Sequence, residues 1–376
     1  ELSSKPQLII HFDLNGTILL KDSSLGHTLR SAINALLAEV TWGFISEEGL
    51  KRTKEERRVP DFIFLKDFGP SSSPPDASCI SFGTYLYQHT SLPGNEIRHI
   101  KNTFTEPGCF GERFSPYYNQ IYEKLLIPAS IAADGPSYLK DGHRQIVPAF
   151  FRLFESLVAQ DTFDFRIIFR TFGSDLSDVV EEINDFCKGK HPLYPNQRKY
   201  DGSDPNDPRD FTIILPHQSA CFRRNGEDVR AGIQLSYINK DKLVVVARGA
   251  SKVQEALMKE LLQLTGNSEV KETRINYLLA IQDDFSNWER SDLKGKPLFV
   301  DPSIVQIFFD DCIERDRPVI VDARDASTLE PIPFNLSKDK YLVRAESFDF
   351  LLQEDYYIRW LQTILQTHYP HLPSYP

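Results

Sequence analysis

The sequence contains little cysteine and no long apolar run. Five cysteines occur among 376 residues, they are far apart, and none forms a CxxC pair. This pattern argues against a disulfide-stabilised scaffold and a structural zinc site, and it favours a reducing compartment. No uncharged apolar run approaches the roughly 20 residues that a helix needs to cross a bilayer. We therefore expect a protein that does not enter membranes.

Basic residues are not in excess either. The formal net charge is −10 at pH 7, which disfavours general binding of nucleic acid. The first residues, Glu1 to Lys5, lack the apolar segment of a signal peptide, so we expect a cytoplasmic location. Position 1 is not methionine, which indicates a trimmed or processed chain and leaves a removed targeting segment open. No pattern specifies an oligomeric state.

Aromatic residues are plentiful, with 26 Phe, 15 Tyr and 3 Trp, so the chain can bury a large core and is not disordered as a whole. Apolar runs of strand composition occur at 7–12, 165–169, 277–281, 305–309 and 319–321. Helical spacing of apolar residues occurs at 28–40, 117–126, 145–158, 175–186, 251–264 and 356–367. The alternation predicts an α/β fold with a Rossmann-like, mostly parallel sheet and helices on both faces.

Polar residues that directly follow the predicted strands are candidates for function, because ligands of such folds bind outside the carboxyl ends of the strands. Asp13, Thr171 and the pair Asp310 and Asp311 occupy such positions. Adjacent carboxylates repel each other unless a cation relieves them, and Mg²⁺ prefers oxygen ligands. The Thr171 hydroxyl can hold a phosphate oxygen, and Lys296 can neutralise an anionic nucleophile and its phosphoryl adduct.

Each of these signals also has a plainer structural interpretation. Asp13 can cap a turn, and the acidic pair can be a solvated strand end. Thr171 can be a turn residue, and Lys296 an ordinary surface lysine. Taken singly, these alternatives stay open. The four signals in this order are more specific than any one of them.

In this order the motifs resemble those of the haloacid dehalogenase (HAD) superfamily. The run IIHFDLNGT at 9–17 resembles its first motif, a strand ending in Asp-x-Asp-x-Thr, and FRTFG at 169–173 is similar to its second. The lysine motif is matched by GKP at 295–297, and the acidic fourth motif by IFFDD at 307–311. The resemblance covers about half of the chain and points to an unassigned eukaryotic branch, which indicates no substrate.

The resemblance implies Mg²⁺-dependent phosphoryl transfer. Asp13 would attack phosphorus and become an aspartyl phosphate. Mg²⁺ would be held by the Asp13 carboxylate, the Asp310 carboxylate and the main-chain carbonyl of Asn15. Asp311 would be a supporting ligand. A metal and a lysine supply the charge neutralisation that phosphoryl transfer needs.

The resemblance also implies a phosphate-binding set. Thr171, Thr17 and the loop residues Phe172 and Gly173 would hold the phosphoryl group, and a lysine would stabilise the nucleophile. We expect that lysine on a helix and assign it to Lys296. Because Lys296 lies close before the fourth motif for such a helix, Lys294 is the second choice.

Asn15 departs from the family pattern, which has a second Asp there that protonates the leaving group and activates water. An amide cannot do this work, although its main-chain carbonyl can still bind a metal. Slow or substrate-assisted hydrolysis, a binding protein without turnover and an engineered substitution are all open explanations. Alternatively, a carboxylate or histidine from the cap or from the loop Phe172–Asp175 supplies the proton.

The gaps between the motifs are much longer than a bare core needs. We expect a core of residues 1–21, 144–188 and 250–376, a cap insertion at 22–143 and a smaller β-rich insertion at 189–249. A large cap favours a small phosphorylated metabolite as substrate, because a cap closes the cleft and excludes water.

The leading hypothesis is a Mg²⁺-dependent phosphatase. A phosphotransferase or phosphomutase of the same fold is the alternative enzyme. A catalytically impaired protein that binds a phosphorylated ligand is the alternative without turnover. Basic residues within 51–58 or at 223–224 could reach a phosphate, although solvated surface charge is the plainer interpretation.

Overall fold

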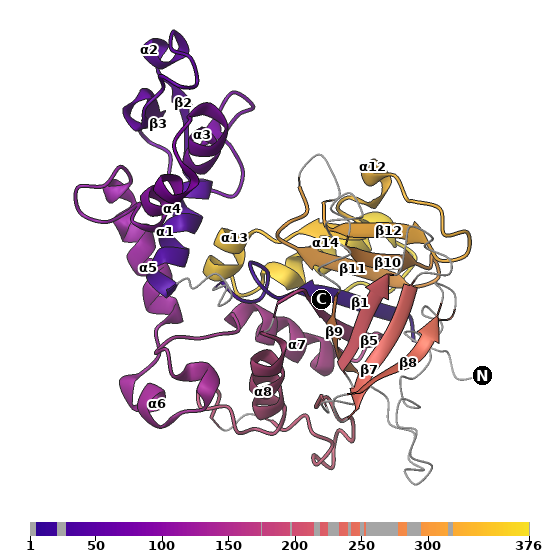
Figure 1. Cartoon of the computed structure of the whole chain (residues 1–376). Coiled ribbons are helices and arrows are strands. Elements are labelled where there is room, and N and C mark those ends of the chain that lie inside the picture. Colours follow the sequence, from indigo (N-terminus) through magenta and orange to yellow (C-terminus); the bar gives the residue numbers. More distant parts are fainter. Residues whose placement is uncertain are drawn as a thin grey trace.

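The computed structural model describes residues 5–20, 28–173, 175–195, 198–213, 219–224, 233–239, 242–248, 252, 277–283, 295–314 and 319–375. Its largest described sheet has the strand order β13-β11-β1-β5-β9-β6-β7-β8. The strands are β1 (Gln7–Asp13), β5 (Asp164–Thr171), β6 (Ser219–Arg224), β7 (Ile233–Asn239), β8 (Lys242–Arg248), β9 (Leu278–Gln282), β11 (Val305–Asp310) and β13 (Leu342–Arg344). All neighbours from β13 to β6 are parallel, and β7 and β8 add an antiparallel edge. Helices flank this sheet (Figure 1), which confirms the predicted Rossmann-like α/β fold.

Alternation along the central strand β1 separates an aromatic face of the sheet from a polar one. Phe12 lies on the face covered by α7 (Pro148–Gln160) and α14 (Tyr356–His368), and its ring packs edge-on against Phe150 and Tyr357. Helix α8 (Leu176–Cys187) packs beside α7, with the Phe186 and Phe151 ring centroids 4.3 Å apart. His11 and Asp13 point to the other face, because side chains of a strand alternate.

Two parallel strands, β10 (Lys296–Val300) and β12 (Val321–Asp325), form a small sheet near that polar face. The short helices α12 (Phe334–Ser337) and α13 (Ser347–Leu352) follow. The strand predicted at 319–321 begins only at Val321, because Ile320 has a φ of 75° and interrupts extended backbone. The helix predicted at 251–264 lies outside the described residues apart from Lys252.

A lobe of residues 28–143 stands beside the sheet (Figure 1). It contains α1 (Leu29–Val40), β2 (Trp42–Ile45), α2 (Glu47–Leu50), β3 (Phe62–Phe64), β4 (Ile80–Ser81), α3 (Phe82–His89), α4 (Gly94–Asn102), α5 (Ser115–Leu125) and α6 (Ala129–Asp134), with 3₁₀ turns at Val59–Asp61, Glu112–Phe114 and Ser137–Leu139. Thr28 begins α1 by a capping box with Ser31. Packed rings fill the interior of the lobe, including those of Phe62, Phe82 and Phe104. The lobe occupies the segment for which the sequence predicts a cap.

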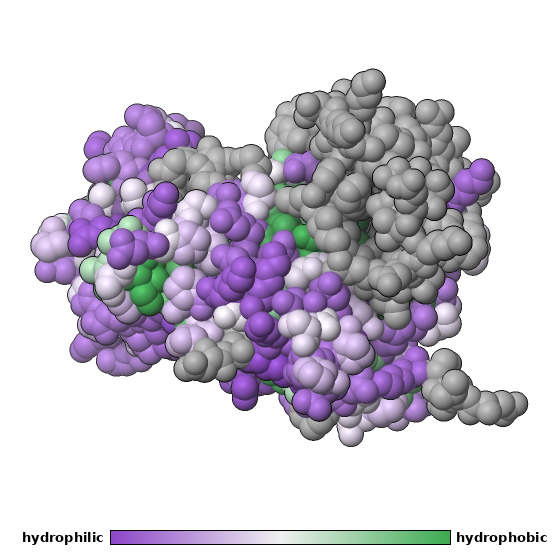
Figure 2. Space-filling view, turned by 90° about the horizontal axis from the view of Figure 1, so that it is seen from below, coloured by the Kyte–Doolittle hydropathy of each residue, from purple (hydrophilic) through white to green (hydrophobic). Residues whose placement is uncertain are grey.

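Strands β6 to β8 lie in the segment for which the sequence predicts a β-rich insertion, and they extend the main sheet. On the face shown in Figure 2, the described surface is mostly hydrophilic, with small hydrophobic areas. None of the helices that the structure describes combines the length and the hydropathy that a membrane-crossing segment needs.

Candidate active site

Three polar side chains predicted from the sequence lie at the carboxyl ends of neighbouring strands. Asp13 ends β1, Thr171 ends β5 and Asp310 ends β11. The register pairs Phe12 with both Phe169 and Phe309, so the strand ends are level with one another. Each of the three strands is buried at its carboxyl end, and the parallel register brings the polar ends to one edge of the sheet.

Lys296 connects two of these strand ends. Its Nζ donates to Oδ1 of Asp13 at 2.5 Å and to Oδ2 of Asp310 at 2.8 Å, and its side chain is only 1% exposed. The expectation of a helical lysine is wrong, because Lys296 is the first residue of β10, and its main-chain N–H donates to the carbonyl of Ile320. The apolar run Leu298 to Val300 that follows it continues as a strand beside β12. Lys294 lies outside the described residues.

The site holds more negative than positive charge. Burial alone would lower the pKa of Lys296, but Asp13, Asp310 and Asp283 together raise it, so the lysine stays protonated. Burial raises the pKa of Asp13, and Asp310 and Asp311 add to this against the opposing effect of the lysine. Burial and then Asp310 raise the pKa of Asp311 to about 6. Among the residues that the structure describes, the ammonium of Lys296 thus lies near the carboxyl groups of Asp13, Asp310 and Asp311.

The donor set is suited to a hard divalent cation. One oxygen each of Asp310 and Asp311 and the Cys312 sulfur lie within 4.8 Å of one another. Although Cys312 is exposed, partial desolvation and then the charges of Asp311 and Asp310 raise the pKa of its thiol, which makes it a poor ligand. Carboxylates and main-chain carbonyls are the ligands that Mg²⁺ takes. The predicted ligands Asp13, Asp310 and Asp311 therefore fit Mg²⁺ in chemistry.

Gly16 lets the first-motif loop approach the acidic pair. Its φ is 74°, and a β-carbon there would overlap the Asp311 carboxylate. Thr17 accepts a hydrogen bond from the main-chain N–H of Asp311 through its hydroxyl at 3.2 Å. The hydroxyl predicted to bind phosphate thus joins the first and fourth motif loops.

The second-motif loop folds over its own threonine. The main-chain N–H of Gly173 donates to the Thr171 hydroxyl at 2.9 Å, so the hydroxyl oxygen serves as a local acceptor and the predicted phosphate-binding N–H of Gly173 is engaged within the loop. The Phe172 ring lies beside Lys296, with Nζ 5.1 Å from the ring centroid. The loop therefore places an aromatic wall next to the lysine.

Asn15 makes a contact that sequence reasoning only partly anticipated. Its Nδ2 donates to Oδ2 of Asp175 at 3.1 Å, while its Oδ1 is buried without a hydrogen-bond partner among the described residues. Asp175 directly precedes α8. It belongs to the loop named as one alternative source of a proton.

A buried ion pair beneath the site was missed. Arg170 donates to both carboxylate oxygens of Asp283 at 2.8 and 2.6 Å, and to the carbonyl of Pro297 at 3.1 Å. Two signals could have identified it. Arg170 interrupts an apolar strand. Asp283 directly follows the last residue of β9, a position like that of Asp13 at the end of β1.

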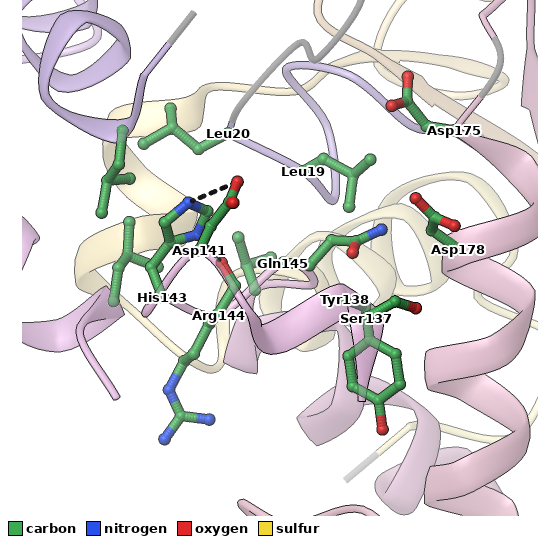
Figure 3. Close-up of a pocket in the computed structure, with 13 residues that line it drawn as sticks. Leu19, Leu20, Ser137, Tyr138, Asp141, His143, Arg144, Gln145, Asp175 and Asp178 are labelled. Atoms are coloured by element: carbon green, nitrogen blue, oxygen red, sulfur yellow. Dashed lines mark hydrogen bonds and ion pairs between the residues drawn. The ribbon is translucent and has the colours of Figure 1, made fainter. Parts of the chain in front are cut away.

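A pocket of about 250 Å³ adjoins the strand-end site, and Asp175 is common to both. Leu29 and Leu125 line it from the lobe, and Asp178 lines it from α8. Figure 3 shows Asp175 and Asp178 on one side and Asp141 with its partner His143 on the other. The pocket thus combines an apolar wall with polar side chains between the lobe and the sheet.

The basic residues within 51–58 lie far from this site. They follow α2, at the end of the lobe away from the sheet (Figure 1), and are mostly exposed. Arg52 pairs with Asp61 at 2.6 Å. Side chains at 223–224 are outside the description. The basic residues within 51–58 therefore fit the interpretation as solvated surface charge.

Comparison with protein-family models, curated proteins and solved structures finds no significant match to this chain.

Proposed function

We propose that this chain is a Mg²⁺-dependent phosphatase of HAD type that hydrolyses a small phosphate monoester through an aspartyl phosphate on Asp13. The contact of buried Lys296 with Asp13 and Asp310 carries the proposal. Burying a lysine between two carboxylates costs desolvation free energy, which the ion pairs often do not repay. A chemical role for the charge therefore accounts for this arrangement better than a gain in stability does. Phosphoryl transfer needs such charge, because negative charge accumulates on the transferred group.

Each residue near Asp13 has a task in this reaction. One carboxylate oxygen of Asp13 attacks phosphorus, while Lys296 favours the ionised carboxylate against the burial that raises its pKa and afterwards faces the phosphoryl oxygens. Thr171 supports the phosphoryl group with its hydroxyl. The pocket beside Asp175 receives the alcohol part of the substrate.

Mg²⁺ would be held by Asp13, Asp310, Asp311 and the main-chain carbonyl of Asn15. When bound, it would neutralise charge on the transferred phosphoryl group. The excess of carboxylates over lysine, and the burial that raises the pKa of Asp13 and Asp311, support this assignment.

Labelling of the nucleophile tests the proposal. Incubation with p-nitrophenyl phosphate and Mg²⁺ should release phosphate and leave a phosphoenzyme on Asp13. The Asp13→Ala variant should lose both this labelling and the binding of beryllium fluoride, because no other carboxylate can take its place in line with phosphorus. If Asp13→Ala keeps the parent rate, the nucleophile lies elsewhere and the proposal is wrong.

Asn15 favours a second candidate, a protein that binds a phosphorylated ligand with little turnover, because the amide cannot exchange a proton. A phosphotransferase would form the same phosphoenzyme. Acceptor-dependent transfer without phosphate release identifies the transferase. Ligand binding without any Asp13 labelling identifies the binding protein.

A further inference from the structure

The side chain of Asp175 lies at the first-motif loop although the residue directly precedes α8. Its Oδ2 accepts a hydrogen bond from Nδ2 of Asn15 at 3.1 Å, and the residue is buried. Asp is a common N-cap residue because its carboxylate satisfies free N–H groups of the first turn. In α8, however, the side chain of Asp175 makes no capping hydrogen bond. Helix capping therefore does not explain its position.

Three polar atoms converge around Gly173. A β-carbon at Gly173 would lie 3.1 Å from Oδ2 of Asp175, 3.4 Å from Nδ2 of Asn15 and 3.4 Å from Oγ1 of Thr171. The carboxylate therefore lies in the same small space as the hydroxyl assigned to the phosphoryl group. The chain between Thr171 and Asp175 is short, so the loop keeps the Asp175 carboxylate close to the Thr171 hydroxyl.

We propose that Asp175 supplies the acid–base function that Asn15 lacks, with the Asn15 amide holding its carboxylate at the reaction centre. This inference rests on the proposed function. The buried Oδ1 of Asn15, which has no hydrogen-bond partner among the described residues, is an acceptor for the attacking water. The two side chains thus divide between them the work that one Asp does in the family pattern.

The protons balance over the two steps. In the first, an Asp13 oxygen bonds to phosphorus, the bond from phosphorus to the ester oxygen breaks, and the leaving alkoxide takes a proton from the Asp175 carboxyl group. In the second, water attacks the phosphorus of the aspartyl phosphate and gives a proton to the Asp175 carboxylate. The bond from phosphorus to Asp13 then breaks, inorganic phosphate leaves, and both side chains return to their initial states.

An exchange of the two residues tests the assignment with p-nitrophenyl phosphate. Its leaving group needs no proton, so Asp175→Asn should still form the phosphoenzyme with a burst of p-nitrophenolate. Hydrolysis of that phosphoenzyme should slow by about 10²–10⁴-fold, because activation of water loses its base. The double variant Asn15→Asp with Asp175→Asn reverses the pair at constant charge and should recover most of the lost rate.

Glu181→Gln is the matched control, since Glu181 is an exposed carboxylate of the same helix that accepts a hydrogen bond from Ser137. It should hydrolyse the phosphoenzyme at the parent rate. Beryllium fluoride should bind Asp175→Asn as it binds the parent, because binding to Asp13 requires no proton transfer. If beryllium fluoride does not bind Asp175→Asn, the rate of phosphoenzyme hydrolysis in the double variant decides whether the assignment is right, since the double variant keeps the charge of the pair.

Two results would overturn the inference alone. One is an Asp175→Asn phosphoenzyme that is hydrolysed as fast as that of Glu181→Gln. The other is an exchanged variant as slow as Asp175→Asn, since the two positions would then not share one role. Absence of Asp13-dependent labelling in the parent would instead overturn the proposed function, and this inference with it.

Discussion

Asp311 differs from its neighbour Asp310 in that no ammonium group of the described residues is in hydrogen-bond contact with it. Lys296 donates to Asp13 and Asp310 only, and burial with the charge of Asp310 raises the pKa of Asp311 to about 6. An ordinary Asp has a pKa of about 3.9 in an unfolded chain. The charge state of this residue therefore couples folding to pH.

The sign of this coupling predicts the behaviour of Asp311→Asn. A raised pKa in the folded chain adds stability that is complete below about pH 4 and is lost as pH rises to about 6. Without divalent cations, Asp311→Asn should therefore melt at a higher temperature than the parent at pH 7, with the difference shrinking towards pH 4. Thermal unfolding at both pH values measures this. Glu123 is an exposed carboxylate of α5, and Glu123→Gln should leave the melting temperature unchanged at both pH values.

Some site residues could be predicted one by one, and others could not. Asp13, Thr171 and Asp310 follow apolar strands, and strand ends of a parallel sheet meet at one edge. The partnership of Asn15 with Asp175 joins residues 160 positions apart. It depends on how two loops fold over the strand ends, which no local pattern encodes.

At the scale of elements, Arg170 and Asp283 tie β5, β9 and β10 together. The ion pair is almost completely buried, and Arg170 also donates to the carbonyl that follows Lys296. Removing one partner of such a pair leaves a buried charge, which costs about 3–5 kcal/mol. The position of the site lysine therefore depends on the pair.

We predict that Asp283→Leu and Arg170→Met each lower the free energy of unfolding by about that amount, and that the double variant loses less than either alone. Urea unfolding monitored by circular dichroism measures the three values. Strict additivity of the two single effects would show that the residues do not act as a pair.

Long, strongly patterned elements could be predicted from the sequence, and short ones could not. Strands β1, β5 and β11 and helix α14 agree with their predicted ranges within a few residues. Strand β13 has three residues and takes its place from pairing with β11. Lys296 was assigned to a helix because the expectation came from a family pattern, whereas the local run favours a strand.

At the scale of the whole molecule, cation binding should stabilise the fold. A ligand that binds only the folded chain raises stability by RT ln(1 + [L]/Kd), which is about 2.7 kcal/mol at a hundredfold excess over Kd. We predict that Mg²⁺ raises the melting temperature of the parent at pH 7 and that a chelator reverses the shift. Asp310→Asn should reduce the shift strongly. An equal Mg²⁺ shift in Asp310→Asn would contradict the metal assignment.

The general architecture followed from alternating patterns, but the arrangement of the lobe did not. Its elements are short, and packed aromatic rings such as Phe64, Phe82 and Phe104 hold them together. The pocket between lobe and sheet depends on that packing, because Leu29 and Leu125 line it from two separate helices. Sequence spacing cannot encode such a surface.

The loop after β1 is held by the far end of the chain. The Tyr357 hydroxyl donates to the main-chain carbonyl of Thr17, and the Ser347 hydroxyl donates to that of Gly16. A ribosome that adds about 5–20 residues per second makes Thr17 long before Tyr357. During synthesis the loop after β1 therefore lacks its final supports for tens of seconds, so an emerging chain acquires the geometry of the candidate site only after residue 357 has left the exit tunnel.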